Sequence, residues 1–270
     1  MLNADRAART DQRTPCVLVI GGHDPAGAGI QADIETCAAL DCLALTVVTA
    51  LTTQNTAGVH GYRTTDPREL QRQVELLASE FPLDACKIGM VPDRHMAAAL
   101  VELCDGTLRG LPLVVDPLLR AGSGAPLADD DMRAGWLDLI ARASVTTPNR
   151  AEACALSGGT TVTAAAQALL AQGAAAVLVT DAASTTDSIV NLLFAAHGGA
   201  PIHSAMARFP GEYHGTGCTL ASAIACGLAR RLTLGTAIEQ AQAFVHRAVA
   251  RAHQVGARQA IPNRQAARDE

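Results

Sequence analysis

The sequence predicts an α/β protein in which a mainly parallel β-sheet carries helices on both faces. Short apolar runs alternate with segments of helical periodicity along most of the chain, without an internal repeat or a low-complexity linker. Residues 111–115 are apolar throughout and are closed by Asp116 and Pro117, which is typical of a central strand covered on both sides. The 270 residues fit one large α/β domain, which we place at 15–254, between tails at 1–14 and 255–270.

The first half of the chain begins as strand, glycine-rich turn and helix. Residues 16–20 form a β-branched apolar run that ends at Gly21 and Gly22, and a helical pattern then extends from Ile30 to Leu40. The patterns that follow predict a strand at 43–51, an amphipathic helix at 67–79, a buried strand at 85–90 and a helix at 96–103.

The second half continues the alternation. After the central strand at 111–115, a helix is expected at 130–141, a strand at 144–147 and a short helix that Glu152 opens. A helix at 163–172 and a strand at 175–180 come next, followed by extended runs at 188–195 and 201–209. A glycine-rich loop then opens a helix that ends at Arg230 and Arg231, and a last helix is expected at 236–253.

Composition excludes several function classes. The net charge of -5, the absence of a basic run and the 3% aromatic content argue against nucleic acid binding and favour small ligands. No apolar run approaches the length of a membrane span, so no membrane partner is expected. The eight cysteines form no C-x-x-C pair, which argues against zinc and predicts reduced thiols in a cytoplasmic protein.

The loop around residues 215–218 is the candidate catalytic centre. Gly215, Thr216 and Gly217 precede the helix, where unpaired backbone N–H groups and the helix dipole favour an oxyanion. Cys218 lies where the same field favours a thiolate over a thiol. The alternative is that the glycines only cap a buried helix and that Cys218 is a small core residue.

Polar side chains, and in one case a methionine, follow the predicted strands. Parallel-sheet proteins bind ligands at the carboxyl ends of their strands, so these side chains and the 215–217 loop should share one rim. The sequence has no G-x-x-x-x-G-K-[ST] phosphate loop, which excludes a P-loop enzyme. A kinase of another design fits, since the residues offer an anion loop, Mg²⁺ ligands and a base. The strand-end residues are Gly22, Asp24, Gln54, Met90, Asp116, Asn149 and Asp181.

These motifs together resemble one family. The matching stretches are GIQAD at 29–33, TALTTQNT at 49–56, KIGM at 87–90, Asp116 with Pro117, TPNRAE at 147–152 and GTGCTL at 215–220. With these stretches the chain resembles the hydroxymethylpyrimidine and phosphomethylpyrimidine kinases of thiamine biosynthesis, which have the ribokinase-like fold, a three-layer sandwich. The resemblance implies ATP-dependent phosphorylation of 4-amino-5-hydroxymethyl-2-methylpyrimidine and then of its monophosphate.

The resemblance also implies roles for individual residues. Gln54 would hydrogen-bond the aminopyrimidine, which Gly22 and Asp33 would help to hold, while Met90 and Leu118 would form apolar walls. The residues expected to bind the nucleotide are Asp116, Arg120, Asn149 and Thr180. The residues expected to hold Mg²⁺, through bridging water molecules, are Asp116, Asn149 and Glu152. Cys218 occupies the position at which relatives acting on sugars carry an aspartate base, and its role as the base is our hypothesis.

The chain departs from the family pattern where the family carries lysines. Gly122 replaces one lysine, and Asp181 with its two neighbours replaces a second lysine motif, so we expect Arg120 to supply a cation to the polyphosphate. Two alternatives stay open: a pyridoxal or pyridoxine kinase, and a catalytically weak pyrimidine-binding regulatory domain. The family also suggests a homodimer.

Overall fold

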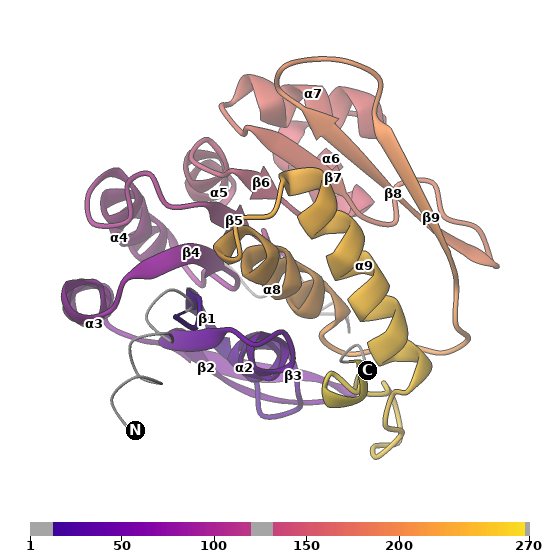
Figure 1. Ribbon diagram of the computed structural model, residues 1–270, viewed down its shortest axis with the longest axis horizontal. Helices are drawn as coiled ribbons and strands as arrows, with labels where there is room; N and C mark the ends of the chain where they lie inside the picture. Colours follow the sequence, from indigo (N-terminus) through magenta and orange to yellow (C-terminus); the bar gives the residue numbers. More distant parts are fainter. Residues whose placement is uncertain (1–12, 120–131, 268–270) are drawn as a thin grey trace, which may run out of the picture.

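The computed structural model describes residues 13–119 and 132–267, and these form one nine-stranded sheet with helices around it (Figure 1). The strand order is β3-β2-β1-β4-β5-β6-β7-β8-β9. The strands from β2 to β7 in this order are parallel, whereas β3, β8 and β9 pair antiparallel at the two edges. The predicted mainly parallel sheet is confirmed.

The elements follow the expected alternation, with boundaries shifted by a few residues. The strands are β1 (Cys16–His23), β2 (Leu43–Asn55), β3 (Gly58–Thr64), β4 (Leu83–Ile88), β5 (Leu113–Val115), β6 (Val145–Thr146), β7 (Ala176–Val179), β8 (Ser188–Ala195) and β9 (Ile202–Ala207). The helices are α2 (Gly29–Ala39), α3 (Pro67–Glu80), α4 (Arg94–Asp105), α5 (Met132–Ile140), α6 (Arg150–Ser157), α7 (Val162–Ala171), α8 (Thr216–Ala229) and α9 (Leu234–Ala250), with a 3-10 turn η1 at Gln265–Ala267.

Two hydrophobic cores cover the two faces of the sheet. Alternate residues of β1 point to opposite faces, so Leu18 and Ile20 join one core while Val17 and Val19 join the other. The first core includes apolar residues of α3 to α7, and the second includes those of α2, α8 and α9 (Figure 1). This three-layer arrangement leaves the carboxyl ends of the parallel strands uncovered by helix packing.

A β-hairpin lengthens one edge of the sheet beyond the expected strand. β2 continues to Asn55 instead of ending near residue 51, and β3 pairs with it. The turn forms because the Asn55 side chain accepts hydrogen bonds from the N–H groups of Ala57 and Gly58, at 2.9 and 3.2 Å. The sequence analysis did not identify β3, because its residues alternate little in hydrophobicity.

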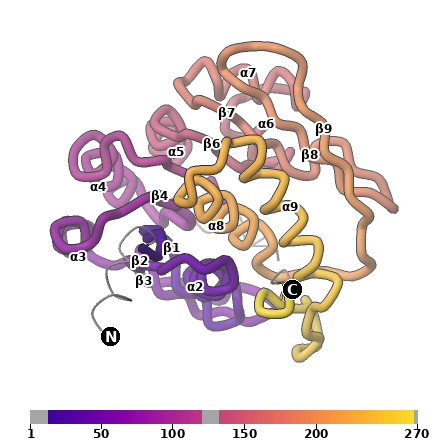
Figure 2. Tube along the Cα trace, viewed as in Figure 1, coloured from indigo at the N-terminus to yellow at the C-terminus, as the bar shows by residue number. Residues whose placement is uncertain are grey.

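The ends of the described chain are held more firmly than expected. Arg13, inside the predicted N-terminal tail, pairs with Asp84 at 2.6 Å. The expectation that residues 255–270 trail over the surface is wrong for 259–267, where Arg264 is 1% exposed and η1 packs against α2 and α9 (Figure 2). In the described residues no single helix is long and apolar enough to cross a membrane, although the bent pair α6 and α7 passes on combined length and composition.

Candidate active site

One pocket of about 740 Å³ lies where the parallel strands end, as the sequence analysis expected. It is lined both by residues that follow β1, β4, β5, β6 and β7 and by the loop that opens α8. The sequence-predicted residues that line it are Gly22, Asp24, Gln54, Met90, Asp116, Leu118, Asn149, Glu152, Thr180, Asp181, Gly215, Thr216, Gly217 and Cys218. Arg120 lies outside the described residues, and Asp33 does not line the pocket.

The loop before α8 presents unpaired backbone amides to the pocket. Gly215 caps the helix with a left-handed φ of 82° and offers no side chain. The first hydrogen bond of the helix runs from the N–H of Thr219 to the Gly215 oxygen at 2.9 Å, so the N–H groups of residues 216–218 have no acceptor within the helix. These donors at the positive end of a 14-residue helix form an anion cradle.

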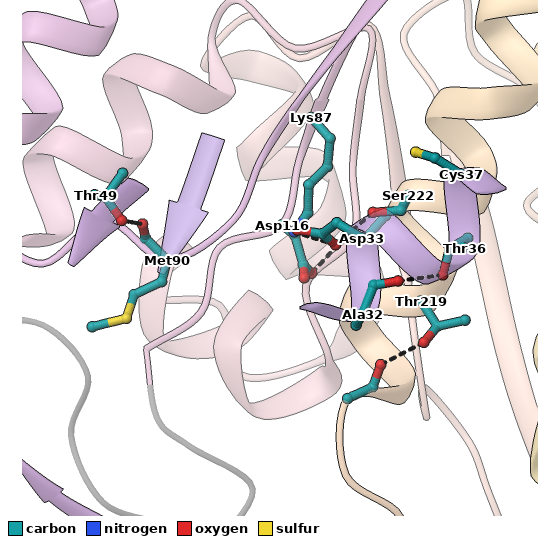
Figure 3. A network of polar contacts seen from close by, with 12 residues as sticks. Ala32, Asp33, Thr36, Cys37, Thr49, Lys87, Met90, Asp116, Thr219 and Ser222 are labelled. Carbon is teal, nitrogen blue, oxygen red and sulfur yellow. Dashed lines mark hydrogen bonds and ion pairs between the residues drawn. The ribbon is translucent and has the colours of Figure 1, made fainter. Parts of the chain in front are cut away.

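A small apolar wall lies at the β2 side of the pocket. Met90 and Ala50 form a third hydrophobic cluster, against which Leu118, Val59 and Tyr62 pack. The Met90 carbonyl is fixed by the Thr49 hydroxyl, which donates to it at 2.7 Å (Figure 3). A Cβ on Gly22 would lie 2.6 Å from the Met90 sulfur, so the glycine lets this side chain approach. Gln54 lines the same pocket and supplies an amide beside the wall.

Asp33 is a buried partner of Lys87 rather than a pocket residue. The Lys87 ammonium contacts both Asp33 carboxylate oxygens, at 3.0 and 2.9 Å, and the Ser222 hydroxyl donates to one of them at 2.6 Å (Figure 3). The expected contact of Asp33 with a pyrimidine is therefore not supported. Burial lowers the pKa of Lys87, but Asp33, Cys218 and Asp116 together raise it above its usual value, so the lysine stays charged.

Asp116 is the carboxylate with an unused oxygen. The Thr147 hydroxyl donates to its Oδ1 at 2.8 Å, whereas its buried Oδ2 has no hydrogen-bond partner among residues 13–119 and 132–267. Burial raises the pKa of Asp116, while the nearby Lys87 opposes this. A Cβ on Gly217 would lie 4.0 Å from Asp116 Oδ2, so this carboxylate faces the anion cradle across the pocket.

Asn149 and Glu152 form the cap of α6. The Asn149 side chain accepts from the N–H of Glu152 at 2.9 Å, and the Glu152 carboxylate accepts from the N–H of Asn149 at 2.9 Å. Burial raises the pKa of Glu152 to about 7. Among the described residues no three His, Cys, Asp or Glu side chains cluster at metal-binding distance. Asp116 Oδ2, which has no partner in the described part of the chain, is nevertheless the type of ligand that a hard cation prefers.

Cys218 carries a thiol, not the expected thiolate. Burial raises its pKa to about 12, and the neighbouring Lys87 and the N–H of Gly29 offset only part of that rise. The prediction that the helix start favours the ionised form is wrong, because the rise of the pKa on burial outweighs the lowering by Lys87 and by the Gly29 N–H. The side chain is 8% exposed and lines the pocket.

Sequence reasoning missed two polar groupings in the pocket. Asp24 was expected at the rim, but its partner was not: the His214 imidazole lies 2.7 Å from the Asp24 carboxylate, and both side chains are buried. At the β7 side, the Asn191 amide accepts from the N–H of Asp181 at 3.1 Å and donates to Gln242 at 2.7 Å. Asn191 could have been suspected, because it interrupts the apolar run of β8.

The missed cation of the pocket is Arg208. Its guanidinium pairs with Asp181 at 2.8 Å, next to the predicted nucleotide residue Thr180. In the described part of the pocket lining, Lys87 and Arg208 are the side chains with a permanent positive charge. Arg208 therefore lies beside Asp181, where the lysine motif was expected, although it follows β9 and not β7.

Known proteins are similar to this chain in both sequence and fold. A family model described as phosphomethylpyrimidine kinase matches residues 24–263. A hydroxymethylpyrimidine/phosphomethylpyrimidine kinase of Rhizobium meliloti is 36% identical over 254 residues, which cover 88% of this chain and 92% of the relative. A probable chloroplastic thiamine biosynthetic bifunctional enzyme of Oryza sativa is 35% identical, but the chain spans only about half of that protein, 46%.

Solved structures of small-molecule kinases have a similar fold. Pyridoxal kinase from Staphylococcus aureus, in complex with AMP-PCP and pyridoxal, superposes with a TM-score of 0.82 at 26% identity, over 94% of this chain and 95% of that one. The fold is therefore that of the ribokinase-like kinases, as the sequence predicted. Because the family model spans most of the chain and a relative of similar length is more than one third identical, the chain belongs to the phosphomethylpyrimidine kinase family.

Proposed function

We propose that this protein phosphorylates 4-amino-5-hydroxymethyl-2-methylpyrimidine with ATP, and then its monophosphate to the diphosphate. The observation that carries the proposal is that an anion cradle and an apolar wall with an amide line one pocket. A flat heterocycle can rest on Met90 beside Gln54 while the transferred phosphoryl group meets the amides of residues 216–218. The relatives named for both phosphorylations support the same substrate.

Each part of the pocket has a place in this reaction. Cys218, next to the cradle, is our candidate for the base: its minor thiolate form would take the proton of the attacking hydroxyl. Thr180, which follows β7, and Arg208, which follows β9, also line the pocket and are our candidates for contacts with the nucleotide. Mg²⁺ would be held by Asp116, with Asn149 and Glu152 acting through water, and it would neutralise charge on the phosphates. A homodimer and a cytoplasmic location remain part of the proposal.

A pyridoxal kinase is the second candidate. It is favoured by the likeness to the Staphylococcus aureus enzyme, because pyridoxal also carries a hydroxymethyl group on a flat ring. A catalytically weak regulatory domain would bind the pyrimidine without releasing ADP. Product formation from each alcohol separates the three functions.

We expect Gly217→Ala to slow phosphoryl transfer strongly without unfolding the protein. The added Cβ would meet nothing closer than Asp116 Oδ2 at 4.0 Å, and alanine is the better helix former by about 1 kcal/mol. The methyl group would nevertheless occupy the space above the cradle amides, and kcat should fall by about 10²- to 10³-fold. Steady-state kinetics and thermal unfolding measure the two effects.

Gly235→Ala is the matched control, because Gly235 is also the second residue of a helix and an added Cβ there meets nothing within 4 Å. It should leave kcat unchanged. A Gly217→Ala enzyme with wild-type kcat would show that the phosphoryl group does not use this cradle.

Removing the Gln54 amide should weaken binding of the pyrimidine alone. Gln54→Ala leaves the polar groups of the substrate unpaired, which costs about 1 to 3 kcal/mol and raises KM for the pyrimidine about 5- to 150-fold. KM for ATP should not change. Thr53→Ala serves as the control, since the side chain of this neighbouring residue is exposed and does not line the pocket. Equal rises in both KM values would place Gln54 elsewhere in the reaction.

A further inference from the structure

The segment after α9 returns to the active-site loops. The Ala260 carbonyl accepts from the N–H of His214 at 2.9 Å, and the Ala260 N–H donates to the Glu212 oxygen at 2.9 Å. A Cβ on Gly27 would lie 3.1 Å from Ile261, so the same segment also packs against the first glycine turn. Residues 259–267 therefore contact both glycine-rich loops.

Arg264 makes the strongest of these connections. Its side chain is fully buried and donates from Nε to the Thr219 hydroxyl at 2.9 Å and from Nη2 to the Gly27 oxygen at 2.8 Å. Nη1 donates to Glu35 of α2 at 2.8 Å. The Thr219 hydroxyl in turn donates to the Gly215 oxygen at 2.7 Å, which continues the chain of hydrogen bonds to the cap of α8.

The two glycine-rich loops meet closely at the Arg264 side chain. A Cβ on Gly215 would lie 2.8 Å from Arg264 Nη2 and 3.0 Å from both Ala28 Cα and the Gly27 oxygen. Arg264 itself is absent from the pocket lining, so it reaches the reaction only through the loops. The planar guanidinium can bond three acceptors in different directions, whereas a lysine ammonium lacks that fixed fork.

We propose that Arg264 is a positioning residue that locks the Gly27 turn and the Gly215 loop together in the geometry needed for phosphoryl transfer. The Gly27 turn follows β1, whose Gly22 lies against Met90 of the apolar wall, and the Gly215 loop forms the anion cradle. A small shift between them moves the hydroxyl relative to the phosphoryl group, and misplacement by about 1 Å costs about 10²-fold in rate. The kinetic part of this inference rests on the proposed function.

Arg264→Ala and Arg264→Lys should each lower kcat by about 10- to 100-fold while KM for ATP and for the pyrimidine changes less than threefold. Arg258→Ala is the matched control, because Arg258 lies exposed in the same segment, and it should keep wild-type kinetics. Thr219→Val removes the hydroxyl that links Arg264 to Gly215 with little change in volume. It should lower kcat in the same direction, and its effect should not add to that of Arg264→Ala.

Amide hydrogen exchange supplies a readout that does not need activity. Arg264→Ala should speed exchange in peptides covering both residues 24–29 and 212–219, and leave β4 and α4 unchanged. Unchanged exchange in either loop would overturn the proposal, as would faster exchange with wild-type kcat. If the wild-type protein fails to phosphorylate the pyrimidine, the proposed function fails, while the exchange comparison still decides whether Arg264 holds both loops.

Discussion

Cys218→Ala should lower kcat for pyrimidine phosphorylation by about 10²- to 10⁴-fold, the range in which general bases contribute to catalysis. The thiol lies beside the cradle at the start of α8, where the attacking hydroxyl would meet the phosphoryl group. KM for ATP should change little, because the Ala variant keeps every backbone amide. Steady-state assays of phosphorylated pyrimidine with MgATP measure the loss of kcat. A variant with the wild-type kcat would exclude Cys218 as the base.

The pH dependence of the wild-type enzyme should report the same residue. Burial raises the pKa of Cys218 to about 12, so its thiolate fraction grows about tenfold per pH unit between 7 and 10. We expect kcat/KM for the pyrimidine to rise over this interval in the wild type and to stay flat in Cys218→Ala. A wild-type profile that does not rise between pH 7 and 10 would contradict a base with this pKa.

Lys87→Met should destabilise the fold by about 3 to 5 kcal/mol, because it leaves the Asp33 carboxylate buried without its cation. Both side chains are almost fully buried, and the charge of Lys87 also faces Cys218 and Asp116. Urea unfolding followed by circular dichroism measures the change. The double variant Lys87→Met/Asp33→Asn should recover part of the loss, since a neutral amide replaces the unpaired charge.

Arg72→Ala is the control for this measurement. Arg72 pairs with Glu69 on the exposed face of α3, where water screens the charges, so the free energy of unfolding should not change within error. A Lys87→Met variant as stable as Arg72→Ala would show that the Asp33 carboxylate finds another partner or takes up a proton.

The strand ends were predictable because each follows a short apolar run closed by a polar residue. Asp116 and Asn149 illustrate this, since periodicity fixes where β5 and β6 stop and parallel pairing brings their ends to one edge. The glycines of the 215–217 loop were equally visible, because helices begin at such sequences. These local rules were enough to gather most of the predicted site residues in one pocket.

The partners of buried charges were not predictable from local patterns. Asp33 lies within a motif shared with the family, yet its partner Lys87 is 54 residues away and the pairing depends on β1 and β4 lying side by side. Arg264 lies 237 residues from Gly27, in a polar segment that composition marks as a tail. The prediction of an ionised Cys218 was wrong for a related reason: its pKa is raised by burial, and burial depends on packing that the sequence does not display.

One assay tests the central claim most directly: purified protein is incubated with MgATP and either 4-amino-5-hydroxymethyl-2-methylpyrimidine or pyridoxal, and the products are identified by mass spectrometry. The account predicts the pyrimidine monophosphate first and the diphosphate later, with pyridoxal a poor acceptor. Release of ADP only with pyridoxal, or no phosphorylated product from either alcohol, would contradict it.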